Sequence, residues 1–332
     1  MPHSYARTRS ILVVVAHPDD EALGFAGVIA GARATGERVR VAVVTNGDSP
    51  RRGWWPPTRG ARAGPPAQCV RYGLRRGRET VAAMAVLGLQ WRRDPRRTDV
   101  VLLGYRNGAL PAIAGASARW EGDPTGLSST YAVGGGTLGR FVRGDLRYLH
   151  DGRHSTLCAE DIARDLDLLL DLSDPTDIFT HVEIDGHPDH SEVHRQVVAA
   201  VERRGSAVTL HSTLIHPEGT ADLMYESALE WPNPAVSATT PHARFTPDLP
   251  FEPPPTDGGP SWGSLGPPDE LLETPPPMRD PDPRRNLKWR AISCYRSQLD
   301  CIRASDGTYH PSCGYLRAFV KRHEFFWTRR FR

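Results

Sequence analysis

The stretch Ile11-Leu12-Val13-Val14-Val15-Ala16-His17-Pro18-Asp19-Asp20-Glu21 places an uninterrupted apolar run directly before a histidine and three acidic residues. A continuous apolar run of this length predicts a strand that is covered on both faces, as in a parallel sheet. Pro18 fixes its own φ and lacks an N–H, so the strand should end there. A helix should begin near Asp20, because acidic side chains suit the positive N-terminal end of a helix. The stretch therefore predicts a strand, a turn that carries metal-binding residue types, and a helix.

A second cluster of the same kind lies about 170 residues further along, in His181-Val182-Glu183-Ile184-Asp185-Gly186-His187-Pro188-Asp189-His190. His187 and His190 are three residues apart, so one imidazole can bind a metal while the other faces a substrate. The carboxyl ends of parallel strands meet at one edge of a sheet, where α/β folds bind their ligands. Two imidazoles and a carboxylate gathered there would form a catalytic zinc set with one position open for water.

The chain order predicts an α/β fold with a Rossmann-like, mostly parallel sheet and helices on both faces. The expected strands are Ile11–Val15, Val39–Thr45, Asp99–Leu103, Ile178–Val182 and Val208–Ile215, and the expected helices are Leu23–Thr35, Gly77–Leu87, Ala159–Leu172 and Ser191–Val201. No Gly-x-Gly-x-x-Gly pattern follows the first strand, which argues against a dinucleotide site.

Together, the two clusters resemble the motifs of the PIG-L/LmbE family of zinc-dependent N-deacetylases. That family includes N-acetylglucosaminyl-phosphatidylinositol deacetylases, the mycothiol-pathway deacetylase, and deacetylases of glycopeptide and aminoglycoside antibiotics. Shorter matches to the family lie at Arg78-Glu79, Leu103–Gly108, Tyr295–Gln298 and Glu324–Phe326. The matched stretches cover roughly residues 10–110, 155–216 and 286–328.

The resemblance implies a metal site and two catalytic residues. His17, Asp20 and His190 would bind one zinc ion per chain, with Fe²⁺ or another divalent metal as the alternative. Asp19 would be the general base that takes a proton from the attacking water. His187 would stabilise the tetrahedral oxyanion or protonate the departing amine.

Five further residues are candidates for supporting roles. Asp185 and Asp189 would orient the imidazoles, because a metal-bound histidine usually donates its other N–H to a carboxylate or a carbonyl. Arg78 would hold a sugar hydroxyl. Asn107 stands where the family has a sugar-contacting aspartate, so it brings an amide without charge to that contact. His216 follows a predicted strand and would face the substrate.

Composition excludes several classes of protein. The net charge of +2 gives no general attraction to nucleic acid, and no segment is long and apolar enough to cross a membrane. The N-terminus is polar and the five cysteines show no zinc-finger spacing, so we expect reduced thiols in the cytoplasm. The 332 residues are expected to form a single domain, and self-association stays open.

Three insertions are expected to decide the substrate, at about residues 51–76, 106–152 and 217–285. The first carries seven arginines with Trp54 and Trp55, and reads either as a solvated basic loop or as a lip for an anionic or aromatic part of a large substrate. The third holds 17 of the 30 prolines, which is too many for regular structure.

The sequence thus predicts zinc-dependent hydrolysis of an N-acyl group, acetyl before larger acids, from an amino-sugar glycoside. The loop sizes favour a bacterial natural product or a thiol-cofactor precursor. One alternative is an amidase that releases a larger acyl group or cleaves a thiol conjugate. Another is a non-catalytic carbohydrate-binding protein on the same fold. A third is a redox enzyme, since two histidines and a carboxylate also bind non-haem iron.

Overall fold

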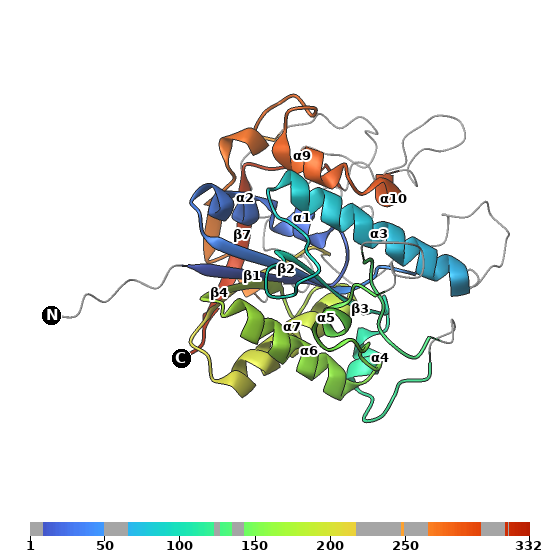
Figure 1. Cartoon of the computed structure of the whole chain (residues 1–332). Helices are drawn as coiled ribbons and strands as arrows, with labels where there is room; N and C mark the ends of the chain where they lie inside the picture. Colours follow the sequence, from blue (N-terminus) through green and yellow to red (C-terminus); the bar gives the residue numbers. More distant parts are fainter. Residues whose placement is uncertain are drawn as a thin grey trace.

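The computed structural model describes residues 9–49, 66–122, 127–134, 143–216, 247–248, 265–299, 316–317 and 319–332 (Figure 1). Trp54, Trp55 and most of the proline-rich segment 217–285 lie outside these ranges, so the expectations for them stay predictions. Within the described part of the chain, no helix is both long and apolar enough to cross a membrane.

A seven-stranded, mostly parallel sheet forms the centre of the molecule, which confirms the predicted fold class. The strands are β1 (Ser10–Val15), β2 (Arg38–Thr45), β3 (Val100–Tyr105), β4 (Asp177–His181), β5 (Thr209–Thr213), β6 (Glu270–Glu273) and β7 (His323–Arg330), in the order β3-β2-β1-β4-β5-β7-β6. Strands β1 to β5 pair in parallel, whereas β7 runs antiparallel to both β5 and β6. β1 and β3 are buried along their whole length, as expected for strands covered on both faces.

Helices cover both faces of the sheet (Figure 1). They are α1 (Asp20–Gly24), α2 (Ala26–Ala34), α3 (Pro66–Val86), α4 (Leu110–Ala114), α5 (Leu146–Asp151), α6 (Ala159–Ser173), α7 (Pro188–Arg204), the 3-10 turn η3 (Pro276–Met278), α9 (Leu287–Ile292) and α10 (Arg296–Leu299). Alternate residues of β1 enter different cores, because successive side chains of a strand point to opposite faces. Ile11 and Val13 pack with α2, α3 and α9, whereas Leu12 and Val14 pack with α4, α6 and α7.

Three predicted helices differ from those observed. The helix expected over Ser191–Val201 is longer at both ends, since α7 covers Pro188–Arg204. The helix expected over Leu23–Thr35 is divided at Phe25, whose φ of −136° and ψ of 5° end α1 before α2 begins. Phe25 is buried, and its ring lies 6.4 Å from that of Phe179 and 6.1 Å from that of Phe326, so core packing decides this break.

α3 begins at Pro66 rather than Gly77, so the second half of the insertion expected over 51–76 is helix. Gly73 weakens the helical signal in this stretch, because glycine is a poor helix former. In the structure Gly73 allows a close approach, since a Cβ there would lie 2.7 Å from the Tyr131 hydroxyl. The insertion expected over 106–152 likewise contains α4 and α5.

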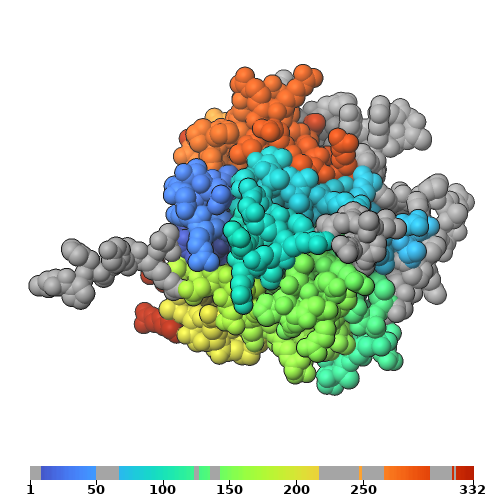
Figure 2. All heavy atoms as spheres, in the orientation of Figure 1, coloured from blue at the N-terminus to red at the C-terminus, as the bar shows by residue number. Residues whose placement is uncertain are grey.

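A buried ion pair joins the C-terminal part of the chain to the N-terminal part. Glu324 of β7 accepts hydrogen bonds from the backbone N–H groups of Gly27 (2.8 Å) and Val28 (3.1 Å) in the first turn of α2. Lys288 of α9 donates to the same carboxylate at 2.6 Å, and both side chains are buried. Figure 2 shows the orange residues around α9 seated above the blue N-terminal residues. The pair therefore fixes α9 and β7 against the helix that follows the first motif.

Lys288→Met is expected to lower the free energy of unfolding by about 3–5 kcal/mol, because it leaves the Glu324 carboxylate buried without its cation. Urea denaturation measures the change. Adding Glu324→Gln should recover part of the loss, since the buried charge is then gone. A loss under about 1 kcal/mol for Lys288→Met, as for an exposed pair, would contradict this account.

Candidate functional site

The two sequence clusters meet at the carboxyl edge of the sheet. β1 leads into His17 and Asp20, and the loop after the neighbouring β4 leads into His190 in the first turn of α7. His17 Nδ1 lies 2.9 Å from His190 Nε2, and Asp20 Oδ2 lies 3.4 Å and 3.2 Å from these two nitrogens. Ligands of a tetrahedral zinc ion, at about 2.0–2.1 Å, are separated by roughly 3.3 Å. The three donor atoms therefore fit one small divalent cation.

The charges within this triangle balance one another. Burial alone would raise the pKa of Asp20, but the His190 and His17 imidazoles hold it well below its usual range. Burial would lower the pKa of His190, yet the Asp20 and Asp185 carboxylates together raise it to about 10. A bound cation would take over the role of that proton, because a ligating histidine must be neutral.

Asp189 supports the first imidazole from outside the triangle. Its Oδ2 lies 3.2 Å from His17 Nε2, the nitrogen that points away from Asp20. The same carboxylate accepts backbone N–H groups from Gly108 (2.5 Å) and Leu110 (3.1 Å) at the start of α4. Asp189 thus links His17 to the segment after β3, the kind of outer contact that fixes the orientation of a metal ligand.

Asp185 does the same for the second imidazole. Its Oδ1 lies 3.1 Å from His190 Nδ1 and accepts the His187 N–H at 3.0 Å. Its Oδ2 accepts N–H groups from Ile215 (2.9 Å) and His216 (3.1 Å), which follow β5. Burial would raise the pKa of Asp185, but the His190 imidazole, with His216 and His181 nearby, holds it below its usual range. The carboxylate therefore stays charged and joins two neighbouring strand ends.

His187 is the N-cap of α7 and faces the first cluster. Its ring lies 4.4 Å from that of His17 and 5.0 Å from that of His190. Its Nδ1 accepts the Asp189 N–H at 3.1 Å. When Nδ1 accepts, the proton of the neutral ring must be on Nε2. His187 is therefore set to donate a hydrogen bond from Nε2.

His216 lies beside the candidate metal ligands, as the sequence suggested from its place after a strand. It is buried, and its ring is 5.0 Å from that of His190 and 5.8 Å from that of His187. A nitrogen of His216 comes within 4.8 Å of ligand atoms of Asp20 and His190, so His216 could also bind a metal.

Two other histidines near the site have structural contacts. His181 Nε2 accepts the Ala16 N–H at 2.9 Å, and its ring stacks on His190 with centroids 3.8 Å apart. His194 of α7 has its Nδ1 2.8 Å from the His181 carbonyl oxygen. Through these contacts, His181 supports the ring of His190, and His194 contacts the backbone of His181.

Asp19 has an uncommon backbone conformation. It is the N-cap of α1, with φ 117° and ψ −33°, and within the described residues its side chain makes no capping hydrogen bond to that helix. Arg76 of α3 contacts it instead, with Nη2 3.0 Å from Asp19 Oδ2 and a short hydrogen bond to the Pro18 carbonyl. Asp19 therefore provides no side-chain cap for α1, and its carboxylate points toward Arg76 of α3 instead.

Arg76 is a site residue that sequence reasoning missed. The sequence pointed to Arg78, which the structure places on the exposed side of α3, whereas Arg76 is buried at Asp19. The two positions are two residues apart, so a helix presents them on different faces. Sugar binding by Arg78 stays a prediction. The helical spacing of Arg76 with Glu79 and Ala83, both buried, could have indicated the inward face.

Asn107 is held through its backbone. Its N–H donates to Asp48 Oδ1 at 3.1 Å, and its carbonyl oxygen accepts from the Ser49 hydroxyl at 3.1 Å. Asp48 is buried, pairs with Arg106 and accepts from the Tyr131 hydroxyl. No pattern in the sequence pointed to Asp48. It fixes the segment around Asn107, whose sugar contact stays a prediction.

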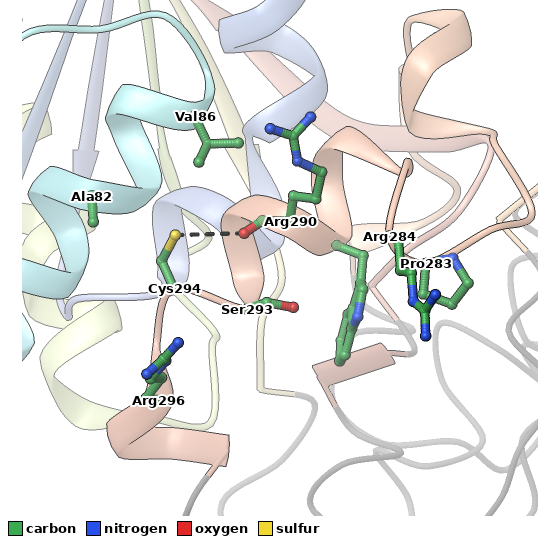
Figure 3. Close-up of a pocket in the computed structure, with 9 residues that line it drawn as sticks. Ala82, Val86, Pro283, Arg284, Arg290, Ser293, Cys294 and Arg296 are labelled. Atoms are coloured by element: carbon green, nitrogen blue, oxygen red, sulfur yellow. Dashed lines mark hydrogen bonds between the residues drawn. The ribbon is translucent and has the colours of Figure 1, made fainter.

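A separate hollow of about 560 Å³ lies between α3 and α9 (Figure 3). Ala82 and Val86 line one side, and Trp289, Cys294 and Arg296 line the other. It contains none of the residues of the two histidine clusters.

The chain belongs to the PIG-L family, described as GlcNAc-PI de-N-acetylases, whose family model matches residues 12–201. The match spans both histidine clusters and confirms the resemblance seen in the sequence.

Among solved structures, one similar chain is a conserved protein from Thermus thermophilus, with 18% identity, 96% and 94% of the two chains covered and a TM-score of 0.44. A deacetylase bound to teicoplanin, from the teicoplanin biosynthesis pathway, has 18% identity, coverages of 96% and 98% and a TM-score of 0.45. The N,N'-diacetylchitobiose deacetylase from Pyrococcus horikoshii has 15% identity, coverages of 66% and 66% and a TM-score of 0.38. Among curated proteins none matches this chain.

Asp185→Asn should weaken metal binding by about 10- to 100-fold, the usual effect of losing the carboxylate behind a ligating histidine. Competition with a chromogenic chelator measures the affinity. Asp167→Asn is the control, since Asp167 pairs with Arg203 on an exposed surface. Equal affinities for the two variants would argue against the role of Asp185.

The conformation of Asp19 predicts an unusual order of stabilities. Asp19→Gly should be more stable than Asp19→Ala by about 1–2 kcal/mol, because positive φ penalises a residue with a Cβ. Asn286, the N-cap of α9 at φ −61°, is the matched control, and its Gly and Ala variants should differ by less. Urea denaturation of the four variants gives both differences. Equal differences at the two positions would contradict the left-handed conformation.

Proposed function

We propose that this chain is a metal-dependent hydrolase that removes an N-acyl group, acetyl in the first place, from an amino-sugar-containing substrate. The observation that carries the proposal is the triangle of His17, Asp20 and His190 donor atoms at the carboxyl edge of the sheet. Membership of a family described as de-N-acetylases agrees with it. Zinc is the metal we propose, because two imidazoles and a carboxylate match a catalytic zinc site.

Amide hydrolysis needs help with both the nucleophile and the carbonyl. The metal, when bound, lowers the pKa of water and polarises the carbonyl oxygen. Asp19, beside these ligands in sequence, takes the proton of the attacking water. The Nε2–H of His187 donates to the oxyanion that forms on the substrate as the carbonyl carbon becomes tetrahedral. Asp19, now protonated, can return the proton to the departing amine, which balances the reaction.

The substrate class follows from the surroundings of the site and from the chain's insertions. We propose a glycoside or amino sugar carried on a larger molecule, such as a bacterial natural product or a thiol-cofactor precursor. Arg78, Asn107 and His216 are the proposed contacts among the described residues, and Trp54 and Trp55 are proposed from sequence alone. Activity on free N-acetylglucosamine as high as on any elaborated glycoside would argue against a large substrate.

Two other functions make different demands on the site. An amidase for larger acyl groups would use the same residues and release an acid other than acetate. A carbohydrate-binding protein would need no general base, so the presence of Asp19 beside His17, Asp20 and His190 argues against that alternative. Iron in place of zinc would leave the reaction a hydrolysis unless turnover required oxygen and a reductant.

The first test is metal content together with acetate release from a panel of N-acetylated amino sugars and glycosides. Near one zinc per chain is expected. Asp19→Asn should keep the metal and lose about 10²–10⁴-fold in kcat, the usual contribution of a general base. His187→Ala should lose about 10²–10³-fold, while His187→Gln, which keeps an N–H donor, should lose less. Bound metal without acetate from any substrate would favour the larger-acyl alternative, and absence of bound metal would overturn the proposal.

A further inference from the structure

We propose that Glu21 and Tyr295 are positioning residues, which hold the backbone of Asp19 in its left-handed conformation and so aim its carboxylate. This inference rests on the proposed function of Asp19 as the base. No role for either residue follows from the two histidine clusters, since Glu21 reads there as part of an acidic helix start and Tyr295 lies far along the chain.

The conformation of Asp19 needs an external restraint. At φ 117° and ψ −33° a residue with a Cβ is strained, and such residues persist only where their surroundings determine them. An aspartate at a helix N-cap ordinarily has an extended backbone and accepts a hydrogen bond from the first turn. Asp19 does neither, and its carboxylate lies at Arg76. Arg76 restrains the side chain of Asp19, so another group must restrain its backbone N–H.

Glu21 supplies that restraint. Its side chain is buried, and its Oε2 accepts the Asp19 N–H at 3.0 Å. Its Oε1 accepts the hydroxyl hydrogen of Tyr295 in a short hydrogen bond. Each carboxylate oxygen thus has a separate donor, and losing either would leave a buried polar group without its partner. The hydrogen bond to Glu21 therefore ties the backbone N–H of Asp19 to a buried side chain.

Tyr295 anchors Glu21 to a rigid part of the fold. It is buried between α9 and α10, and its hydroxyl is also 3.5 Å from Thr80 Oγ1 of α3. Two residues later, the Ser297 N–H donates to Glu79 Oε1 at 2.9 Å, and the Ser297 hydroxyl donates to the other oxygen of Glu79. The segment is therefore fixed to α3, the helix that also carries Arg76. α3 therefore restrains the side chain of Asp19 through Arg76, and its backbone N–H through Tyr295 and Glu21.

The same segment provides a matched control. Cys294 and Arg296, on either side of Tyr295, line the hollow between α3 and α9 (Figure 3). Arg296 is exposed, whereas Tyr295 and Ser297 point into the protein. Arg296→Gln changes the segment without touching Glu21, so it separates a local disturbance from loss of the Tyr295 hydroxyl.

In the metal-loaded enzyme, Tyr295→Phe is expected to lower kcat by about 10- to 100-fold, the cost of a small misplacement of a catalytic group. KM and metal content should not change, and Arg296→Gln should match wild type. Glu21→Gln keeps an oxygen for the Asp19 N–H, so it should retain more activity than the similarly sized Glu21→Met. Equal losses for Glu21→Gln and Glu21→Met, or loss of metal with activity in Tyr295→Phe, would overturn the positioning role.

A second measurement does not depend on activity or metal. The difference in Tm between Asp19→Gly and Asp19→Ala reports the strain at this position. In a Tyr295→Phe background that difference should shrink, because the peptide is then able to relax. An unchanged difference would refute the role of Tyr295. If the Tm difference shrinks but wild type hydrolyses no amide, the restraint is present and the proposed function is at fault.

Discussion

The parallel pairing of β1 with β4 is the constraint on which the site depends. Ile11 pairs with Asp177 and Val13 with Phe179, so strands more than 160 residues apart in sequence end side by side. Each strand then releases its histidine cluster at the same edge of the sheet. Because β1 and β4 pair in a defined register, a slip would move one cluster away from the other. The proximity of the His17, Asp20 and His190 donor atoms is thus a consequence of strand pairing.

Burying several charged groups together would be costly if they were not matched. Three carboxylates, Asp20, Asp185 and Asp189, are interleaved with the imidazoles of His17 and His190, so each charge has an opposite neighbour. The outer carboxylates also accept backbone N–H groups from the segments after β3 and β5. The cluster therefore ties together the loops that follow β3, β4 and β5 at this edge of the sheet.

The C-terminal part of the chain completes the structure around the first motif. Lys288 and Glu324 meet at the start of α2, and Tyr295 reaches Glu21 inside α1. Both contacts join residues near the end of the chain to the helical segment that follows β1. The antiparallel strands β6 and β7 extend the sheet on the β5 side, next to these contacts. Residues from the C-terminal part of the chain, Lys288, Tyr295 and Glu324, therefore support the N-terminal motif.

The sequence by itself determined the parallel α/β class, most strands to within two residues, and the residue types of the candidate metal site, because strand periodicity and the His-Pro-Asp spacing are local properties. It did not determine the break at Phe25, the early start of α3, the contact of Arg76 with Asp19, or the buried positions of Asp48 and Tyr295. These depend on which surfaces meet in the folded chain. A break in a helix follows core packing, and Arg76 reaches Asp19 because its face of α3 is turned inward. Only the tertiary structure brings those surfaces together, so only it decided how Asp19 is held.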